Sequence, residues 1–375
     1  MASLSYGALD GVHGLPLTGP GLRALGADPS PPPLPAQIAE PAGFMVAMDG
    51  AVRIHFLDWG GPTTGTRGRA GVHSVAEAGG NVPASRHYGG EPGVLLIHGL
   101  AQTAWSWAPV ARRVRAMASV VAMDLRGHGL SDAPTDGYDH EQLAEDAIAV
   151  AEGAGLLAYA DDAGPDGTRP FVVAGHGFGA VVAAWTAHAL GDRCAGLVLV
   201  DGGWTDLPAE TGMTPDEWLA AIAEPPEVLR SMDAWLADRN AFDPATWDAD
   251  QERAARSEVV ETAAGRVKPA IHGHALAASV GALWTYRPAF TLPAVVAEVA
   301  ALAARDDDAG RNLQALRETA AARAAAGRGA VHAASFPGLG HNLIRYVPNA
   351  VVAAIRTVGA PPGAPPADAG AHASG

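Results

Sequence analysis

The sequence predicts an α/β fold, with a mostly parallel, doubly wound sheet of about eight strands and a helical cap insertion. Short apolar runs typical of buried strands alternate with longer helical patterns over residues 93–200, and the alternation resumes over residues 294–336. Such alternation favours a parallel sheet with helices on both faces. Residues 203–293, between these halves, carry helical patterns without strand patterns, which indicates an inserted cap. A chain of 375 residues with 48% hydrophobic content suits one large domain of this kind.

The two ends of the chain differ in composition from its middle. Residues 1–42 are rich in Pro and Gly and show no helical or strand periodicity, so we expect a mostly disordered arm. The tail, residues 359–375, contains four prolines among many Ala and Gly residues and is also expected to be disordered. Residues 63–92 are Gly-rich and long for a loop inside a compact domain, which predicts a flexible insertion.

The core is expected to comprise residues 43–202 and 294–358. Residues 44–48 and 52–58 alternate apolar and polar side chains around Asp49-Gly50, a pattern typical of an antiparallel hairpin. Apolar runs predict the other strands, and helical periodicity predicts the helices between them. The predicted strands are 93–97, 119–123, 171–174, 196–200, 294–304 and 331–336, and the predicted helices are 107–117, 140–153, 180–190 and 310–326.

The cap segment, residues 203–293, holds five of the nine tryptophans of the chain. Aromatic side chains in such a segment pack the cap against the core, or they form an apolar ceiling over a substrate cleft. The five residues are Trp204, Trp218, Trp235, Trp247 and Trp284.

Charge and cysteine content exclude several classes of protein. A net charge of −15 argues against a nucleic-acid or anionic-membrane partner, because either needs a concentrated basic surface. The single cysteine, Cys194, permits no intrachain disulfide, and the apolar run that follows it indicates a buried core thiol. The first residues do not resemble a leader peptide, and no apolar run approaches the roughly 18 residues of a membrane span. We therefore expect a cytoplasmic protein.

The most informative motif is a glycine-rich turn between a strand and a helix. The apolar residues 171–174 run into Gly175-His176-Gly177-Phe178-Gly179, and a helix rich in Ala and Val follows. This arrangement has the outline of a nucleophile elbow, G-x-S-x-G, in which the middle residue exposes its side-chain oxygen above the sheet. Here the middle residue is Gly177, which has no side chain and cannot form a covalent intermediate. Glycine also accepts the positive φ of such a turn more readily than serine does.

Four motifs in the right order together resemble the α/β-hydrolase family over residues 44–358. They are the apolar strand ending in His98-Gly99-Leu100, the stretch 124–132 (Asp-Leu-Arg-Gly-His-Gly-Leu-Ser-Asp), the elbow, and Gly340-His341-Asn342. The resemblance implies the α/β-hydrolase fold and an oxyanion hole made by the backbone N–H groups of Leu100 and Phe178. Neither donor depends on a side chain, and one such donor is worth about 3 kcal/mol to a transition state.

The resemblance also implies a catalytic histidine and its orienting acid. His341 follows the last predicted strand, where the family carries its catalytic histidine. The stretch Arg305-Asp306-Asp307-Asp308 makes Asp307 the best match for the acid, with Asp306 close behind. Asp201, at the end of the strand before the cap, is an alternative acid, because some relatives place theirs there. Adjacent aspartates are otherwise typical of a solvated turn or a helix N-cap.

Other polar and aromatic residues are candidates for contact with substrate. His274 and Trp284 lie in the cap segment, while Trp105 and His176 accompany the core motifs. A surface position is the alternative for His274. His98 and His128 belong to family loop motifs and are expected to support backbone.

No cofactor and no metal are expected. His272 and His274 are two residues apart without a nearby cysteine or clustered carboxylates, which gives poor support to a zinc site. The elbow glycines lack the spacing of a dinucleotide-binding fingerprint. The expected partner is a small, uncharged, moderately apolar molecule.

Three hypotheses are compatible with a glycine at position 177. The chain is an active hydrolase of a small apolar ester, lactone or ketone, in which His341 and its acid activate water or abstract a substrate proton. Alternatively, it is a catalytically silent pseudo-hydrolase that binds a small molecule. In the third hypothesis, a single-base change has replaced the serine of an otherwise standard enzyme.

Overall fold

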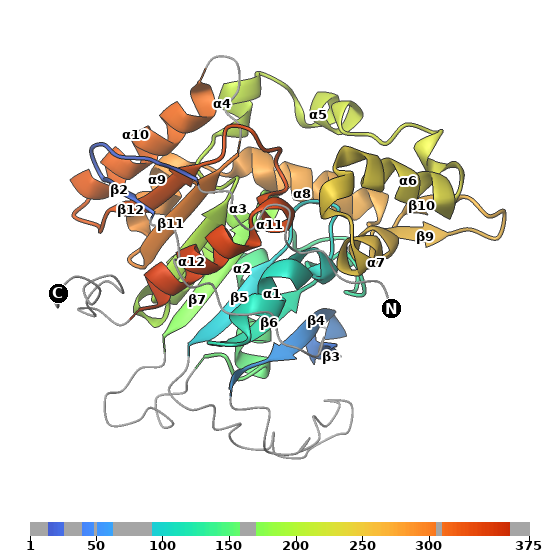
Figure 1. Cartoon of the computed structure of the whole chain (residues 1–375), viewed down its shortest axis with the longest axis horizontal. Coiled ribbons are helices and arrows are strands. Elements are labelled where there is room, and N and C mark those ends of the chain that lie inside the picture. Colours follow the sequence, from blue (N-terminus) through green and yellow to red (C-terminus); the bar gives the residue numbers. More distant parts are fainter. Residues whose placement is uncertain are drawn as a thin grey trace, which may run out of the picture.

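A ten-stranded mixed sheet forms the centre of the protein (Figure 1). The computed structural model describes residues 14–25, 40–48, 51–62, 92–157, 170–304 and 310–360. The strand order is β1-β12-β11-β8-β7-β5-β6-β4-β3, with β2 also paired to β12. The strands are β1 (Leu15–Pro16), β2 (Leu22–Ala24), β3 (Ala42–Ala47), β4 (Arg53–Gly60), β5 (Gly93–Ile97), β6 (Ser119–Met123), β7 (Phe171–His176), β8 (Gly196–Val200), β11 (Glu298–Ala303) and β12 (Val331–Ser335).

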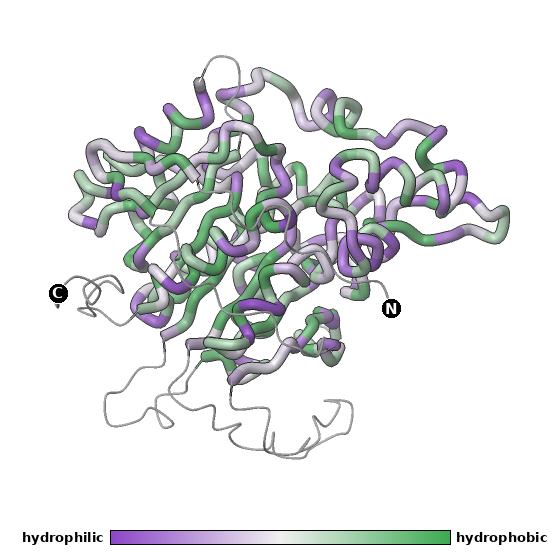
Figure 2. The backbone as a smooth tube through the Cα atoms, viewed as in Figure 1, coloured by the Kyte–Doolittle hydropathy of each residue, from purple (hydrophilic) through white to green (hydrophobic). Residues whose placement is uncertain are grey.

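The six strands from β6 to β12 along this order are mutually parallel, which confirms the predicted architecture. Their apolar runs are buried on both faces, and alternate side chains enter two separate cores. Leu95 and Val173 pack toward one core, whereas Leu96 and Val172 pack toward the other. Burial of each such side chain contributes about 1.5–3 kcal/mol. Figure 2 shows the hydrophobic run of these central strands.

Helices cover both faces of the sheet. The face with Leu95 is covered by α2 (His140–Gly153), α3 (Phe178–Leu190) and α10 (Arg311–Ala325), and the face with Leu96 by α1 (Ala108–Val114) and α12 (Pro348–Gly359). The predicted helix at 107–117 is shorter in the structure, because a 3-10 turn, η3 (Ala104–Trp107), precedes α1 and α1 ends at Val114. The predicted strand at 294–304 begins later, since α9 (Pro288–Ala294) occupies its first position.

The predicted hairpin at the edge of the sheet is confirmed. β3 pairs with β4 in antiparallel register, with Phe44 opposite Phe56, and β4 continues antiparallel to β6. The turn residues Asp49 and Gly50 lie outside the described residues.

Part of the arm that we expected to be disordered is ordered in the structure. β1 and β2 both pair with β12, and Leu17, Leu22 and Leu25 are buried. The missing sequence signal has a physical reason: these strands have two and three residues, too few for a period to appear. The edge of β12 supplies unpaired backbone groups for them. Residues 1–13 and 26–39, most of the 63–92 insertion and the tail from 361 lie outside the described residues.

In the segment predicted to form a cap, residues 203–293, the part from α5 to β10 lies at the right of Figure 1 and contains a small hairpin that the sequence analysis did not predict. β9 (Val259–Glu261) and β10 (Val267–Pro269) pair antiparallel. Three-residue strands are too short to interrupt a helical pattern. Besides α9, the α-helices of this segment are α4 (Leu207–Thr211), α5 (Pro215–Ala221), α6 (Met232–Phe242), α7 (Ala249–Ser257) and α8 (Gly273–Thr285).

Candidate active site

The glycine-rich turn closes tightly between β7 and α3. Gly177 precedes the helix with φ +53° and ψ −116°, and its N–H donates to the Val200 carbonyl. A Cβ atom on Gly175 would lie 2.0 Å from the Gly179 carbonyl oxygen, and one on Gly179 would lie 2.3 Å from that of Ile97. Because real Cβ contacts are never so short, the two outer glycines are required by close backbone packing.

Gly177 is different, because a side chain there would face an imidazole. A Cβ atom on Gly177 would lie 3.0 Å from His341 Nε2 and 3.4 Å from its Cε1. The ring of His341 therefore faces the apex of the turn. Its side chain is 61% exposed, which leaves it open to a molecule from solvent.

The second nitrogen of His341 is held by Asp201. His341 Nδ1 lies 2.6 Å from Asp201 Oδ2, and the Ala304 N–H donates to Oδ1 at 2.7 Å. A carboxylate only accepts, so Nδ1 carries the ring proton and Nε2 presents its lone pair to the turn. Asp201 has φ +44°, a conformation that costs a non-glycine residue about 1–3 kcal/mol and is typical of functional sites.

The acid beside His341 is thus the alternative candidate from the sequence, whereas Asp306 and Asp307 lie outside the described residues. Asp201 follows β8, and His341 follows β12, two strands away in the sheet. The carboxyl ends of parallel strands meet at one edge, which explains how residues 140 positions apart come into contact.

The two backbone donors expected at an oxyanion hole, Leu100 and Phe178, are free of protein acceptors within the described part of the chain. Phe178 is the first residue of α3, so its N–H has no acceptor inside the helix. The loop that carries Leu100 is held by the Gly99 N–H, which donates to Gln102 Oε1 at 3.0 Å. The next residue, Ala101, has φ +60°. Gln102 was missed by the sequence analysis, although it is the first polar residue after His98-Gly99.

His176 was expected to contact substrate, but its side chain is buried in the structure. Its ring is 1% exposed, with Nδ1 3.0 Å from Gln102 Oε1 and Nε2 3.0 Å from the His341 carbonyl oxygen. The ring therefore lies between the Leu100 loop and the His341 loop, and a neutral ring donates its single N–H to one of these two oxygens. Burial, together with the nearby His341, lowers the pKa of His176 to about 3, so the ring is neutral.

The histidines of the family loops support backbone, as expected. His98 Nε2 accepts from the Leu125 N–H, and its Nδ1 lies 2.7 Å from the Gly99 carbonyl oxygen. His128 Nδ1 lies 3.0 Å from the Arg126 carbonyl oxygen. Burial lowers the pKa of His98 and lowers that of His128 to about 3.

The other expected substrate contacts are engaged within the protein. His274 is exposed, and its Nε2 lies 3.2 Å and 3.1 Å from the carbonyl oxygens of Ala133 and Pro134, which matches the surface alternative. The half-buried Trp284 donates from Nε1 to the Met213 carbonyl and packs edge-on against Trp218. The half-buried Trp105 packs edge-on against Trp59, with Arg253 over its ring.

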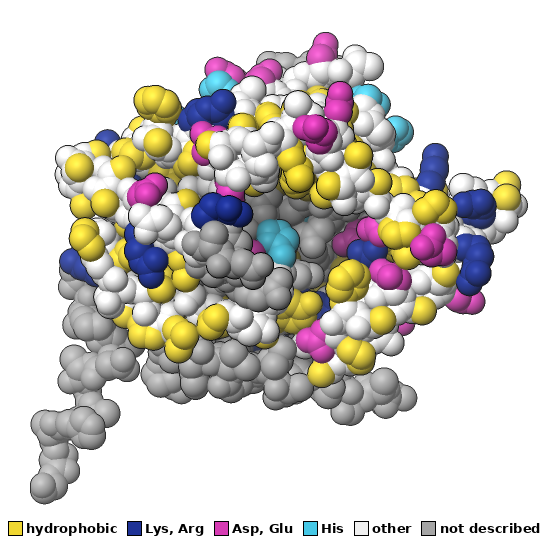
Figure 3. All heavy atoms as spheres, turned by 90° about the horizontal axis from the view of Figure 1, so that it is seen from above, with side chains coloured by type: hydrophobic (Ala, Val, Ile, Leu, Met, Phe, Trp, Pro, Cys, Tyr) yellow, Lys and Arg dark blue, Asp and Glu magenta, His cyan; other side chains and the backbone are white. Residues whose placement is uncertain are grey.

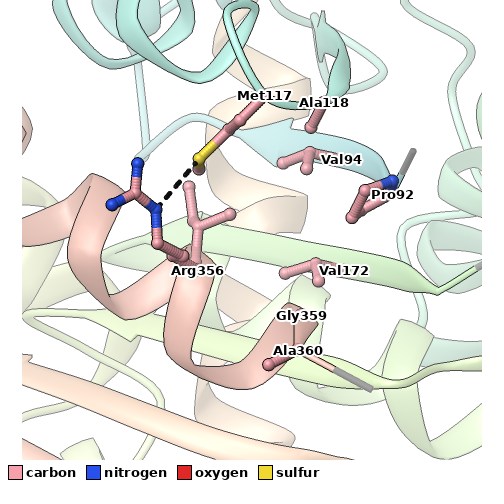
Figure 4. A pocket seen from close by; sticks show the side chains of 9 residues that line it. Pro92, Val94, Met117, Ala118, Val172, Arg356, Gly359 and Ala360 are labelled. Carbon is pink, nitrogen blue, oxygen red and sulfur yellow. Dashed lines mark hydrogen bonds between the residues drawn. The ribbon is translucent and has the colours of Figure 1, made fainter. Parts of the chain in front are cut away.

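The face above the carboxyl ends of the strands is hollowed, and a histidine side chain is exposed in the hollow (Figure 3). An apolar pocket with one cationic side chain lies at the opposite, amino ends of β5 and β7 (Figure 4). Since His341 lies at the carboxyl ends, this pocket is separate from it. The pocket is lined by Pro92, Val94, Met117, Ala118, Val172, Ile355, Arg356, Gly359 and Ala360.

Neither a metal-ligand cluster nor a membrane-spanning helix is present among the described residues. No group of three or more His, Cys, Asp or Glu side chains there is arranged to hold a metal ion. No helix among them combines the length and apolarity that crossing a bilayer requires.

Comparison with known proteins identifies the family. A model described as the alpha/beta hydrolase family matches residues 94–355, well over half of the chain. The chain belongs to the alpha/beta-hydrolase family. The resemblance stated from the four motifs is thereby confirmed, and the elbow, Asp201 and His341 all fall inside the matched region.

Two relatives with known names match parts of the chain. Protein phosphatase methylesterase 1 of Mus musculus is 34% identical over 113 residues, which cover 29% of this chain and 27% of that protein. Lipase LipV of Mycobacterium tuberculosis is 31% identical over 166 residues, which cover 44% of this chain and 52% of the lipase. The chain thus spans about a quarter to a half of the length of these relatives.

Solved structures share the fold at low sequence identity. E-2-(acetamidomethylene)succinate hydrolase superposes with a TM-score of 0.60 and 18% identity, over 85% of this chain and 98% of that one. The thioesterase domain from the curacin biosynthetic pathway superposes with a TM-score of 0.54 and 17% identity, over 84% and 98%.

Proposed function

We propose that the protein hydrolyses a small, apolar ester-, lactone- or ketone-type substrate through the pair His341–Asp201, with the amides of Leu100 and Phe178 as the oxyanion hole. The observation that carries the proposal is the direction of the imidazole. Nε2 faces the Cβ position of Gly177 at 3.0 Å, while Asp201 holds Nδ1 at 2.6 Å. Relatives named as a methylesterase and a lipase support ester chemistry.

Glycine at position 177 requires that His341 act without an elbow hydroxyl. The neutral imidazole would take a proton from water or from substrate, and the two amides would stabilise the resulting oxyanion. A site of this kind that lacks its serine retains about 10³- to 10⁴-fold catalysis over water. We therefore expect slow turnover rather than the rate of a complete triad.

The experiment compares the native chain with Gly177→Ser. The introduced hydroxyl would lie beside Nε2 after the ring shifts by a few tenths of an ångström, and a fluorophosphonate probe should then label the variant strongly and the native chain weakly. Ester hydrolysis by the variant should rise by about 10²-fold or more, since a covalent step is restored. Gly177→Ala is the matched control, because it adds the Cβ without an oxygen. Equal labelling of all three chains, or none of Gly177→Ser, would contradict the proposed site.

A second candidate, a catalytically silent pseudo-hydrolase, is favoured by the same missing oxygen. In that case His341→Ala would leave the binding of a small apolar ligand unchanged, and the native chain would show no turnover. Loss of a native hydrolytic activity in His341→Ala would instead favour the enzyme.

A further inference from the structure

We infer that His341 is itself the nucleophile, attacking the acyl carbon through Nε2, and that the substrates are therefore esters whose leaving group departs as a stable anion. Aryl esters, enol esters and thioesters belong to this class, whereas alkyl esters and amides do not. The inference rests on the proposed function and names the attacking atom and the substrate class of that site.

The first argument is the place that the ring occupies. In a complete elbow, the Cβ and Oγ of a serine stand between the imidazole and the substrate. Here no side chain stands there, and Nε2 lies 3.0 Å from the Cβ position. Asp201 keeps the proton on Nδ1, so the free lone pair is on Nε2, and imidazole is a competent nucleophile toward acyl groups.

The second argument concerns water as the competing nucleophile. A water oxygen approaches a Cα atom no closer than about 3.3 Å, whereas a serine Oγ is only two bonds from its Cα. Water therefore lies farther from the elbow backbone than a serine hydroxyl would, and a misplacement of 1 Å costs about 10²-fold in rate. The imidazole is already held in place, by Asp201 at Nδ1 and by the contact of His176 with the His341 carbonyl.

The third argument links the nucleophile to the leaving group. When imidazole serves as the base of a serine hydrolase, it returns its proton to the leaving group. When Nε2 is bonded to the acyl carbon, that proton does not exist, and the Nδ1 proton is held by Asp201. Both ring nitrogens of the buried His176 lie against oxygen atoms of the protein, so this ring does not supply a proton to the leaving group. The leaving group must then depart unprotonated.

The steps balance without any reactant other than water. The Nε2–C bond forms as the C–O or C–S bond of the substrate breaks, and the leaving group departs with the electron pair as an anion. Water then adds to the acyl-imidazolium, the C–Nε2 bond breaks, and its electron pair returns to Nε2. The carboxylic acid and one proton are released, and the proton neutralises the departed anion in solvent.

The test uses the full chain with p-nitrophenyl acetate in rapid-quench experiments. We expect a burst of p-nitrophenolate and one acetyl group on the peptide that contains His341, found by mass spectrometry and absent from His341→Ala. Ethyl acetate should give no turnover with the native chain, whereas Gly177→Ser should hydrolyse it, because its imidazole is again free to protonate the leaving group. Gly177→Ala should acylate more slowly, since its methyl group stands between Nε2 and the acyl carbon.

The outcomes separate this inference from the proposed function. Hydrolysis that depends on His341, leaves no acetyl group and slows in heavy water would show water as the nucleophile, which overturns the inference and retains the function. Hydrolysis of aryl and alkyl esters at similar rates by the native chain would also overturn it. Absence of any turnover or acylation by the native chain, with Gly177→Ser active, would overturn both.

Discussion

At the scale of single residues, close backbone packing excludes a side chain at two glycines of the turn but not at the third, Gly177. Gly175 and Gly179 are fixed by backbone atoms that a Cβ would meet at 2.0 Å and 2.3 Å. The neighbour of Gly177 is an imidazole that can shift by the few tenths of an ångström a side chain needs. Its positive φ adds strain of about 1 kcal/mol for another residue. The fold therefore tolerates serine at position 177. The chemistry of the site depends on the absence of a side-chain hydroxyl at that position.

Asp201 offers the sharpest prediction at this scale. Asp201→Asn would present an amide N–H to Nδ1, move the ring proton to Nε2 and remove the lone pair that faces the turn. Because a site without its serine retains only about 10³- to 10⁴-fold catalysis over water, we expect Asp201→Asn to lower kcat toward the uncatalysed rate. The measurement is aryl ester hydrolysis by the native chain and the variant at pH 7.5, with thermal unfolding to verify folding.

Asp307→Asn is the matched control, because Asp307 is the acid that the family resemblance favoured. Full activity in Asp307→Asn beside inactive Asp201→Asn would assign the orienting role to Asp201. The reverse pattern would return that role to the Asp-rich stretch 306–308.

At the scale of elements, one cap helix is attached firmly to the core. Arg112 of α1 forms two hydrogen bonds to Asp250 of α7, at 2.6 Å and 2.8 Å, and both side chains are buried. At the end of α7, Ser257 Oγ lies 2.6 Å from Oγ1 of Thr103, which closely follows Leu100 in the chain. Helix α7 is therefore tied to the loop of Leu100, one of the two proposed oxyanion donors.

Removing the Asp250 carboxylate should be costly, because the buried guanidinium of Arg112 loses two short hydrogen bonds, and the carboxylate of Glu40 lies farther away, at 3.7 Å. We expect Asp250→Ala to lower the free energy of unfolding by about 3–5 kcal/mol, measured by urea denaturation. Arg256→Ala on the same helix removes only an exposed pair with Glu252 and should cost about 0.5 kcal/mol or less. Equal effects of the two variants would mean that the buried pair does not hold the cap.

At the scale of the whole molecule, several buried groups titrate abnormally. Burial lowers the pKa of His98, and lowers those of His128 and His176 to about 3. Below about pH 6.5 the unfolded chain binds protons at these histidines, and the folded chain binds fewer. Their contribution to stability is therefore complete above pH 6.5 and is lost as the pH falls toward 3. Glu258 in the cap acts in the opposite direction, because burial raises its pKa to about 7 and folding favours its protonated form below that pH.

These signs predict a net loss of stability between pH 7 and pH 5. Between pH 7 and pH 5, His128 and His176 should each lower the free energy of unfolding by about 2 kcal/mol, and His98 should lower it further. Glu258 should raise it by about 2 kcal/mol over the same range. Urea denaturation at half-unit pH intervals measures the sum. In Glu258→Gln the fall in unfolding free energy should be steeper, since the opposing group is gone. A shallower slope in that variant would contradict the assigned directions.

Local pattern predicted most of the core but few of the contacts in the site. Strands β5, β6 and β8 and helix α2 have the predicted bounds, because each pattern is long enough to appear in sequence. The short strands β1, β2, β9 and β10 did not appear, since two or three residues carry no period. The sequence predicted His341 as the site histidine from its place after the last strand, but it did not predict that the side chain of His176 is buried.

The sequence by itself determined the family, the sheet and the absence of a nucleophile at position 177, because these depend on order along the chain and on residue identity. Only the tertiary structure decided that Asp201 contacts His341, that His176 joins two loops, and that the imidazole faces the empty position. Those relations join residues far apart in the chain, and they arise where the carboxyl ends of parallel strands meet at one edge of the sheet.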